Sequence, residues 1–595
     1  MFNYLRTHDC GSLTKKELDQ DVTLSGWVHR RRDHGGLIFI DLRDRFGLTQ
    51  VVFDPKVNSM IHEQAYKLRS EWVISIKGKV IPRAEGKTNL NLPTGEIEIE
   101  ATDMQILSQA KTPPFSICDE HIEVNEELRL KYRYLDIRRG QVIHNLQVRH
   151  KAMLATRNFM DAEGFLEITT PVLGKSTPEG ARDYLVPSRV HPGNFYALPQ
   201  SPQIFKQLLM VSGMDRYFQI AQCFRDEDLR ADRQPEFTQI DIELSFGTPE
   251  TIYQILEKLV SHIFKKASNI EIQTPFLRMP HKEAMETYGT DRPDMRFGMQ
   301  LIRIDEIAAQ SDFTIFKENL TAGGCVKGLC VTGGSTISRK EIDEYTQIAS
   351  QLGLMGLGWM KRQDEGLSSS IVKFFSPELQ QDLITSFNMQ VGDLIFLAAG
   401  PEERVNQGLD HLRRKLAKDR DLIKPQDYKF LWVVDFPMFK WNVDEQRIES
   451  EHHPFTSPHF EDLHLLESNP VKTRALAYDL VLNGYEIGGG SQRIHNGDMQ
   501  EKVFSLLNLS EKEIQDKFGF FVEALKYGTP PHLGFAFGLD RIVMLLCQTE
   551  NIRDVIAFPK TQKASDLMMQ CPSTVSMDQL KELEIKINPK EIAWL

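Results

Sequence analysis

Two arginine-bearing segments, far apart in the chain, constrain its fold most. The first runs from Phe224-Arg225-Asp226-Glu227-Asp228 to Glu236-Phe237-Thr238-Gln239-Ile240-Asp241, and its apolar flanks predict two strands joined by a charged turn. The second, Gly534-Phe535-Ala536-Phe537-Gly538-Leu539-Asp540-Arg541, predicts a strand that leads into a helix. Guanidinium groups bind phosphate oxygens and stack on rings. Arg225, Arg541 and Phe237 therefore indicate a nucleotide site, with charge for the phosphates and a ring for the base.

In this order, the two segments resemble motifs 2 and 3 of the class II aminoacyl-tRNA synthetases. A predicted helix at Gln141–Glu163, followed by the strand-like run Phe165–Pro171, resembles motif 1, which builds the dimer interface in that family. The helical spacing predicts one apolar arc on this helix, made of Ile143, Leu146, Met153, Leu154 and Met160.

Use of ATP would need a scaffold other than a P-loop, because the chain has no Gly-x4-Gly-Lys-Ser/Thr run. The antiparallel sheet of class II synthetases is such a scaffold. The resemblance implies that Arg225 contacts the α-phosphate, while Arg541 reaches the γ-phosphate and covers adenine opposite Phe237. The predicted ATP site comprises Arg225, Asp226, Glu227, Gln234, Phe237, Glu486, Gly538, Leu539, Asp540 and Arg541, of which Arg225, Arg541 and Glu486 are the predicted catalytic residues.

Asp479 and Glu486 lie seven positions apart in a segment that predicts two neighbouring strands. Carboxylate oxygens are hard ligands that suit Mg²⁺ bridging ATP phosphates. In the family these positions hold the magnesium. The glycines Gly488, Gly489 and Gly490 would let a ligand approach the backbone closely, or would simply form a tight turn.

Four further segments resemble the aspartate-specific class II synthetases of the bacterial type, and the resemblance covers the whole chain. They are Ser176–Tyr184, Gln200–Gln207, His452–Thr456 and Gly490–His495. The resemblance implies that Arg493 and Lys206 bind the side-chain carboxylate of L-aspartate. Asparagine would be rejected because its neutral amide leaves both cations unpaired. The predicted aspartate site also includes Glu179, Gln203 and Asp241 around the ammonium group, Arg225, and the pair His452 and His453.

Residues 1–107 predict a small β-barrel. Five strands with a helix after the third are the order of an OB-fold, which commonly binds single-stranded nucleic acid. The net charge of −12 argues against a general nucleic-acid binder, whereas the local run Arg30-Arg31-Arg32 suits one specific RNA. The predicted strands are Val22–Val28, Leu37–Arg43, Leu48–Phe53, Trp72–Ile81 and Glu96–Ala101, and the predicted helix is Met60–Leu68.

The resemblance assigns the tRNA anticodon contacts to Arg30, His34, Phe39, Gln50 and Gly86. Phe39 would stack on the central uracil, unless it is a core residue of the barrel. His34 stands where members restricted to aspartate tRNA typically carry leucine. Together with Gly86, it resembles the relaxed subgroup that also aspartylates asparagine tRNA. The alternative for His34 is a polar surface residue that reads nothing.

The predicted architecture is a multidomain α/β and β protein. It comprises an OB-fold anticodon-binding domain at 1–107, a hinge at 108–140, a class II antiparallel-sheet catalytic domain at 141–287 and 421–558, an inserted α/β module of the bacterial type at 288–420, and a C-terminal extension at 559–595. The sequence assigns no role to the insertion or to the extension.

Composition predicts a cytoplasmic protein. The seven cysteines are scattered without a CxxC pair, which predicts reduced thiols, and the N-terminus lacks the apolar segment of a secretory signal. The longest apolar run, Leu394–Ala399, is too short to cross a bilayer. We expect a homodimer that uses ATP, Mg²⁺ and L-aspartate, charges tRNA(Asp) and tRNA(Asn), and binds neither membrane nor DNA.

Three alternatives stay open at this point. The chain could charge tRNA(Asp) alone, or it could be the related asparagine or lysine synthetase, which should not need Arg493 and Lys206 together. It could also be a non-catalytic RNA-binding paralogue. Such paralogues usually lose an arginine of motif 2 or motif 3, whereas Arg225 and Arg541 are both present.

Overall fold

The computed structural model describes residues 5–119, 122–177, 180–443 and 445–587. The chain divides into two compact units. The first is Met1–Gln147 with Arg553–Thr574, and the second is Val148–Ile552 with Val575–Leu595. Among the described residues, we find no helix that is both long and apolar enough to cross a membrane.

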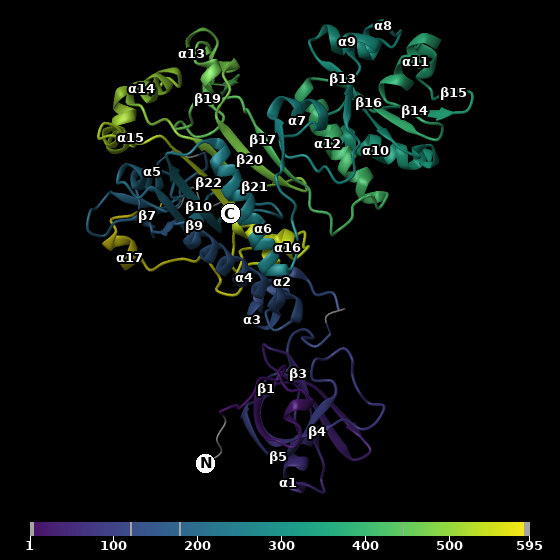
Figure 1. Cartoon of the computed structure of the whole chain (residues 1–595), viewed down its shortest axis with the longest axis vertical. Coiled ribbons are helices and arrows are strands. Elements are labelled where there is room, and N and C mark those ends of the chain that lie inside the picture. Colours follow the sequence, from purple (N-terminus) through teal and green to yellow (C-terminus); the bar gives the residue numbers. More distant parts are fainter. Residues whose placement is uncertain (1–4, 120–121, 178–179, 444, 588–595) are drawn as a thin grey trace. The chain divides into compact units, whose positions relative to one another are not determined.

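The first unit contains a closed barrel of five strands in the order β1-β2-β3-β5-β4 (Figure 1). The predicted OB-fold order is confirmed, including the helix after the third strand. Alternate aliphatic side chains such as Ile38, Ile40 and Leu42 fill its core. The elements are η1 (Lys15–Glu17), β1 (Asp21–His34), β2 (Leu37–Arg43), β3 (Leu48–Phe53), α1 (Ser59–Tyr66), β4 (Val73–Pro82) and β5 (Ile97–Ser108).

Strand β1 is longer than predicted, because it continues past Val28 to His34. Its second half pairs with β2, with Arg32 opposite Phe39 and His34 opposite Leu37. Apolar alternation stops at Val28, so the pattern of side chains gave no sign of this extension. The backbone ladder continues regardless, and it places the three arginines on a strand rather than in a loop.

The segment after the barrel forms hydrogen bonds and an ion pair with residues 553–557, which are distant in sequence but belong to the same unit. Arg133 is buried and donates to the carbonyls of Arg553, Ile556 and Ala557 at 2.7, 2.8 and 3.0 Å. Arg129 pairs with Asp554 at 3.2 Å. Residues 553–574, which follow the last strand and helix of the catalytic sheet, are thereby part of the first unit. The helices here are α2 (Glu126–Lys131), α3 (Arg133–Asp136), the start of α4 (Gly140–Ala162), and η6 (Ile552–Asp554).

The second unit is built on an eight-stranded sheet in the order β11-β17-β20-β21-β22-β10-β9-β6. The two outer pairs, β11–β17 and β6–β9, are parallel, and the pairs between them are antiparallel (Figure 1). The strands are β6 (Leu166–Glu167), β9 (Arg216–Phe224), β10 (Glu236–Ser245), β11 (Leu277–Pro280), β17 (Phe430–Val434), β20 (Ala477–Leu482), β21 (Tyr485–Gln492) and β22 (His532–Gly538).

Helices and short hairpins surround this sheet. Helix α6 begins at a Thr248 capping box with Pro249 in its first turn, and it ends at Asn269 in the left-handed region. Its residue Glu257 accepts a hydrogen bond from the indole of Trp432 in β17 at 3.0 Å. The remaining elements are β7 (Leu185–Pro187), β8 (Phe195–Ala197), α5 (Gln203–Val211), α6 (Pro249–Ser268), α7 (His281–Tyr288), β18 (Phe439–Asn442), β19 (Arg447–Ser450), η4 (Phe460–Asp462), α13 (Leu465–Ser468), η5 (Pro470–Lys472), α14 (Gly497–Leu506), α15 (Glu511–Leu525), α16 (Leu539–Leu546) and α17 (Met577–Glu582).

The predicted apolar arc of α4 is wrong in part. The buried residues are Val142, Asn145, Val148, Ala152, Ala155, Thr156 and Met160, whereas Leu154 is 49% exposed. The buried face is lined largely by small residues, which contribute little to a hydrophobic pattern. The larger apolar residues beside them therefore determined the predicted face, and that face was partly wrong.

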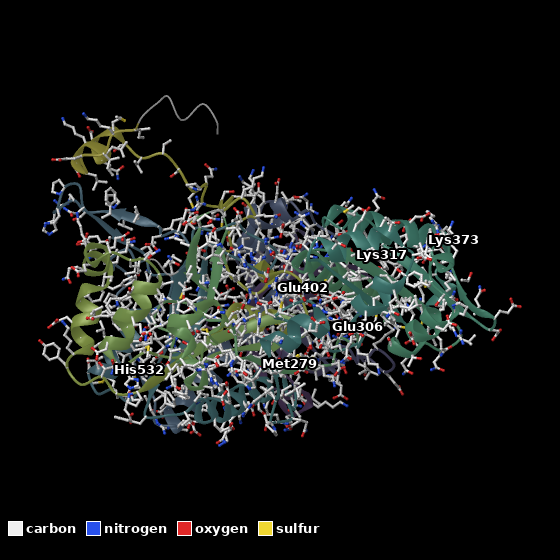
Figure 2. All side chains as sticks on the ribbon, turned by 90° about the horizontal axis from the view of Figure 1, so that it is seen from above. Met279, Glu306, Lys317, Lys373, Glu402 and His532 are labelled. Atoms are coloured by element: carbon white, nitrogen blue, oxygen red, sulfur yellow. The ribbon has the colours of Figure 1, made fainter. Side chains whose placement is uncertain are left out.

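The segment predicted as an insertion forms a sheet of its own, in the order β12-β13-β16-β14-β15. Lys327 in β13 is buried and pairs with Glu286 at 2.7 Å and with Glu402 at 3.1 Å; Glu402 is labelled in Figure 2. The elements are β12 (Leu301–Arg303), α8 (Asp305–Gln310), α9 (Thr314–Thr321), β13 (Cys325–Val331), η2 (Gly334–Thr336), α10 (Arg339–Gln351), β14 (Gly358–Gln363), β15 (Gly366–Ser368), η3 (Val372–Phe374), α11 (Pro377–Ser386), β16 (Leu394–Gly400) and α12 (Glu402–Asp419).

Arg413 of α12 anchors the segment that leads into this sheet. The side chain is fully buried and donates to the carbonyls of Asp294, Gly298 and Met299 at 2.8, 2.7 and 3.3 Å. Its guanidinium also lies 4.9 Å from the ring of Tyr288. One side chain therefore satisfies three backbone acceptors in a segment that forms neither helix nor strand.

We predict that Arg413→Met destabilises the inserted sheet by roughly 2–4 kcal/mol, because a buried guanidinium is lost and three carbonyls, of which that of Asp294 is buried, lose their donor. The control is Arg414→Met. Arg414 is the next residue, but its side chain is 49% exposed and it forms an ion pair with Asp410, so its loss should cost less than about 1 kcal/mol. Hydrogen exchange of the β13 and β16 amides measures both. Equal effects of the two substitutions would contradict the role of Arg413.

Candidate active site

The candidate site lies on the central strands β10 and β22. Phe237, Gln239, Asp241 and Glu243 alternate along β10 and therefore share one face. The neighbouring positions on β22 are small: Gly538 is opposite Gln239, Ala536 is opposite Asp241, and Gly534 is opposite Glu243. Small residues on one strand leave room above the polar side chains of the other. A polar trough thus crosses the middle of an otherwise apolar sheet.

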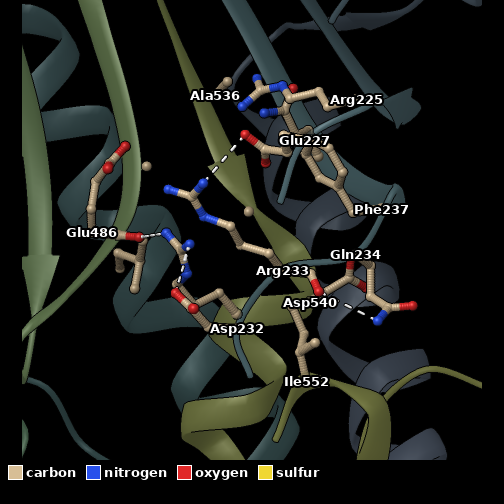
Figure 3. A pocket seen from close by; sticks show the side chains of 15 residues that line it. Arg225, Glu227, Asp232, Arg233, Gln234, Phe237, Glu486, Ala536, Asp540 and Ile552 are labelled. Carbon is tan, nitrogen blue, oxygen red and sulfur yellow. Dashed lines mark hydrogen bonds and ion pairs between the residues drawn. The ribbon is translucent and has the colours of Figure 1, made fainter. Parts of the chain in front are cut away.

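One end of this trough is a pocket that brings together the predicted nucleotide-binding residues. It is lined by Arg225, Glu227, Asp232, Arg233, Gln234, Phe237, Gln239, Glu486, Ile487, Gly488, Ala536, Gly538, Asp540, Arg541 and Ile552 (Figure 3). The guanidinium of Arg225 lies 5.1 Å from the centre of the Phe237 ring. Its Nε is buried, and we find no hydrogen-bond partner for it among the described residues.

Arg541 is already engaged in this pocket. Its Nη1 donates to the carbonyl of Glu486, and its Nη2 pairs with Asp232 at 3.1 Å (Figure 3). Arg233, two residues before Pro235, pairs with Glu227 at 3.3 Å. Asp232 and Arg233 were not predicted as site residues, although both lie in the charged turn between β9 and β10. The clustering of charge in that turn was the available signal.

Two residues of the predicted ATP site do not line the pocket. The amide of Asp226 donates to the carbonyl of Arg182 at 3.0 Å, and its side chain is half exposed. Leu539 is fully buried in the core at the start of α16. The side chain of Leu539 is therefore not available to a ligand, whereas that of Asp226 is exposed outside the pocket. Gln234 lines the pocket and is buried, and Asp540 lines it as well.

Asp479 and Glu486 come together on β20 and β21, as predicted for neighbouring strands. A bulge between Leu480 and Val481 shifts the register, so that Asp479 is opposite Gly489. A Cβ at Gly489 would lie 2.5 Å from Asp479 Oδ1 and 3.5 Å from Glu486 Oε1, so both carboxylates converge over this glycine. Burial, and then the charge of Glu486, raise the pKa of Asp479 well above its usual range. A cation would relieve that repulsion.

The carboxylate pair is a candidate pair of metal ligands. Within the described ranges, no group of three or more His, Cys, Asp or Glu side chains could hold a metal ion. Two carboxylates suit Mg²⁺ when phosphate oxygens and water complete its shell.

The other end of the trough holds four buried charges. Lys206 on α5 donates to Asp241 at 3.1 Å and lies 3.5 Å from Glu243. Arg493 donates to Glu243 through Nε at 2.9 Å and through Nη2 at 3.2 Å. Both cations are 2% exposed or less. The structure thus brings the two predicted carboxylate-binding cations to one place, each already paired with an anion.

Glu243 was not predicted from the sequence. Burial alone would raise its pKa, but Arg493 and Lys206 lower the pKa of this carboxyl overall. Its close pairing depends on Gly534, since a Cβ there would lie 1.7 Å from Glu243 Oε2. The available signal was its spacing: Asp241 and Glu243 are acidic at alternate positions of an apolar strand, which places both on one face.

The histidine pair closes this end. His453 Nε2 lies 2.5 Å from Arg493 Nη1, and the ring of His452 packs edge-on against Phe436. Burial lowers the pKa of His452 to about 4, and it lowers the pKa of His453 well below its usual value. Both rings are therefore neutral at pH 7.

Three polar side chains of the predicted aspartate site have a buried atom without a hydrogen bond to any described residue. Gln203 Nε2, Asp241 Oδ2 and His452 Nε2 are buried, and each lacks a hydrogen-bond partner within the part of the chain that the structure describes. Burial raises the pKa of Asp241. Unpaired buried polar atoms are costly, so a polar ligand that paired with them would be stabilised here. Glu179, predicted for the same site, lies outside the described residues.

The barrel presents a second polar surface. Phe39 lies on the outer face of β2, between the inward-facing Ile38 and Ile40, so it is not a core residue. Beside it, Arg32 donates to Asp41 at 2.7 Å and to Gln50 at 3.1 Å. Gln50 donates to Glu98 at 2.5 Å. Glu98, which was not predicted, is part of this network; its position in β5 gave no separate signal.

The other predicted RNA-binding positions lie around the barrel. Arg30 and His34 are exposed on β1, and Gly35 and Gly36 form the turn after it, both in the left-handed region with φ of 63° and 81°. Gly86, with φ of 74°, is exposed in the connection between β4 and β5. Substitution at these glycines would strain the backbone even though there is open space around them.

Known protein families and individual proteins resemble this chain over nearly its whole length. A model described as "tRNA synthetases class II (D, K and N)" matches residues 125–562, and one described as "OB-fold nucleic acid binding domain" matches residues 22–107. A protein of Protochlamydia amoebophila named aspartate–tRNA(Asp/Asn) ligase is 66% identical over 100% of this chain and 99% of its own length. One of the same name from Chlamydia pneumoniae is 56% identical over 98% of this chain and 99% of its own.

Solved structures give the same fold. Asparaginyl-tRNA synthetase from Pyrococcus horikoshii, complexed with asparaginyl-adenylate, has a TM-score of 0.59 at 18% identity, covering 94% of this chain and 99% of that one. A putative aspartyl-tRNA synthetase from Leishmania major also has a TM-score of 0.59 at 18% identity, covering 94% of each chain. The matched segments contain both the barrel and the trough. The chain therefore belongs to the class II aminoacyl-tRNA synthetases of the D, K and N group, which are ATP-dependent ligases, and it carries an N-terminal OB-fold.

Proposed function

We propose that this chain is an aspartate–tRNA ligase that charges both tRNA(Asp) and tRNA(Asn). The observation that carries the proposal is the buried cluster of Lys206, Arg493, Asp241 and Glu243 directly beside the nucleotide pocket. Two cations suit the side-chain carboxylate of aspartate, and an unpaired Asp241 oxygen suits its ammonium group. The names of the Protochlamydia and Chlamydia relatives support the same substrate and both tRNAs.

The first step needs no general base on the protein. The α-carboxylate of aspartate is already ionised and attacks the α-phosphorus of ATP, and pyrophosphate leaves. Arg225, with its unpaired Nε, would hold the α-phosphate, and Arg541 would bind the γ-phosphate after releasing Asp232. Catalysis is then positioning together with neutralisation of charge. Asp479 and Glu486 would hold Mg²⁺, which supplies further positive charge at the phosphates.

Selection of aspartate over asparagine follows from the hydrogen-bond donors of the cluster rather than from its net charge. Lys206 and Arg493 are matched by Asp241 and Glu243, so the empty cluster is neutral. An aspartate carboxylate can share the inward-facing Nη1 of Arg493, which lies beside His453 and Ser491. Asparagine would place an amide N–H against these donors, and a buried donor without an acceptor costs about 1–3 kcal/mol.

We also propose that the enzyme is a cytoplasmic homodimer. Leu154 on α4, Leu166 on β6, and Val172 and Leu173 after β6 are exposed apolar side chains near motif 1 in the sequence, and exposed apolar groups of this kind suit a subunit interface. The cysteines are all free, which suits a reducing compartment. The OB-fold face carrying Phe39, Gln50 and His34 would bind the anticodon.

We predict that Arg493→Leu abolishes aspartate-dependent ATP–pyrophosphate exchange, because Lys206 alone cannot orient the carboxylate. Arg447→Leu, a change of an exposed arginine in the same unit, should leave exchange intact. Arg493→Leu also leaves the buried Glu243 without one of its cationic partners, which could destabilise the protein. The double variant Glu243→Gln/Arg493→Leu removes both charges, and its exchange activity is measured if the single variant is unstable. Exchange within tenfold of wild type in a folded variant would refute the role of Arg493.

We predict that Asp232→Asn lowers the KM for ATP by about two- to fivefold, because Arg541 no longer has to release a carboxylate before it binds phosphate. The size corresponds to a partly exposed ion pair of about 0.4–1 kcal/mol. The KM for aspartate, measured in the same exchange assay, serves as the control and should not change. A raised KM for ATP would mean that Asp232 assists binding rather than competing with it.

We predict that purified tRNA(Asn) transcript is aspartylated with a kcat/KM within a thousandfold of that for tRNA(Asp). His34→Leu should reduce charging of tRNA(Asn) more than that of tRNA(Asp), because a neutral imidazole offers a donor and an acceptor to either third anticodon base, cytosine or uracil. Exchange without tRNA reports whether the variant is folded. If the unmodified protein charges tRNA(Asn) with a kcat/KM more than a thousandfold below that for tRNA(Asp), the enzyme is specific for tRNA(Asp).

A further inference from the structure

The two groups assigned to the faces of adenine stand on different elements. Phe237 is at the start of β10, and Arg541 is in the first turn of α16. Adenine can fit between the Phe237 ring and the Arg541 guanidinium only if the start of β10 and the start of α16 are held at a fixed separation. The residue after Phe237 and the residue before Arg541 are in direct contact: the amide of Thr238 donates to Asp540 Oδ2 at 2.7 Å.

A third element is bonded to both of these neighbours. Arg149 on α4 donates through Nη1 to Asp540 Oδ1 and through Nη2 to Thr238 Oγ1, the latter at 2.8 Å. Its side chain is 17% exposed and that of Asp540 is 3% exposed. The planar guanidinium therefore spans the junction of β10 and α16 with two donors in a fixed geometry, which a lysine ammonium cannot reproduce.

Arg149 also balances a charge that would otherwise act on the nucleotide site. Asp540 lines the pocket, and it is adjacent in sequence to Arg541. Without a cation on Asp540, this carboxylate would be free to pair with Arg541 or to repel a triphosphate. Because Arg149 takes one of its oxygens and the Thr238 amide takes the other, Arg541 is left to face the pocket.

We propose that Arg149 is a positioning residue for the nucleotide, setting the separation of Phe237 and Arg541 by clamping Thr238 and Asp540. The proposal rests on the proposed function in one respect, namely that adenine binds between these two side chains. Arg149 does not line the pocket and is not a catalytic residue. It lies on the same helix as the exposed Leu154, so the helix of the proposed subunit interface would also determine the geometry of the ATP site.

The test is steady-state ATP–pyrophosphate exchange by Arg149→Met, Arg149→Lys and a matched control, Arg157→Met, in the full-length protein. Arg157 is on the same helix two turns later, but its side chain is 43% exposed and it pairs with Glu167. Arg149→Met should raise the KM for ATP tenfold or more, with the KM for aspartate within twofold of wild type. Arg149→Lys should give an intermediate KM for ATP. Arg157→Met should match wild type.

The split between the two KM values separates positioning from a general structural role. Equal rises for ATP and aspartate, together with a lower melting temperature, would overturn the proposal, and so would an unchanged KM for ATP. If Arg149→Met does not fold, Thr238→Val decides, because it removes one of the two bonds and keeps the charge pair; a KM for ATP equal to wild type then overturns the proposal. Absence of aspartate-dependent exchange in the unmodified protein would instead refute the proposed function.

Discussion

The pairing of Glu243 with Arg493 and Lys206 is the interaction on which the active site depends. All three side chains are buried, so each charge would be very costly without its partners. Such a cluster is rarely a net source of stability, since desolvation offsets much of the attraction. Its effect is to fix position: Lys206 comes from α5, Glu243 from β10, and Arg493 follows β21. Three elements are thus held in register around one space, while Gly534 on β22 leaves room for the pair.

The nucleotide end follows the same principle with weaker partners. Arg541 is paired with Asp232, and Arg233 is paired with Glu227. These pairs are partly exposed, so exchanging them for phosphate contacts costs far less than opening the buried cluster. On the proposed function, the end that binds the amino acid is preformed, whereas the arginines at the nucleotide end are paired with carboxylates of one turn that a ligand can displace. A triphosphate, with several negative charges, can outcompete a single carboxylate for each arginine.

Much of this architecture was accessible from sequence, and the failures have physical causes. The barrel strands β2 and β3 were predicted to the residue, because aliphatic alternation and turn residues mark their ends. The end of β1 and the buried face of α4 were not, because charged residues continue the one and alanines line the other. Glu243 was missed because a buried acid looks like any other acid until its partners are known. Lys206 and Arg493 are far from it in sequence, and only the fold brings them together.

The structure also explains why motif 1 cannot be judged from its own residues. A helix followed by a strand is common, and the apolar pattern of α4 favoured the wrong stripe of side chains. The feature that distinguishes α4 is a polar side chain. Arg149 donates hydrogen bonds at the junction of β10 and α16, where the residues next to Phe237 and Arg541 meet. One face of α4 is buried, and the adjoining face exposes Leu154. On the two proposals together, one helix carries buried packing, the geometry of the nucleotide site and the subunit contact.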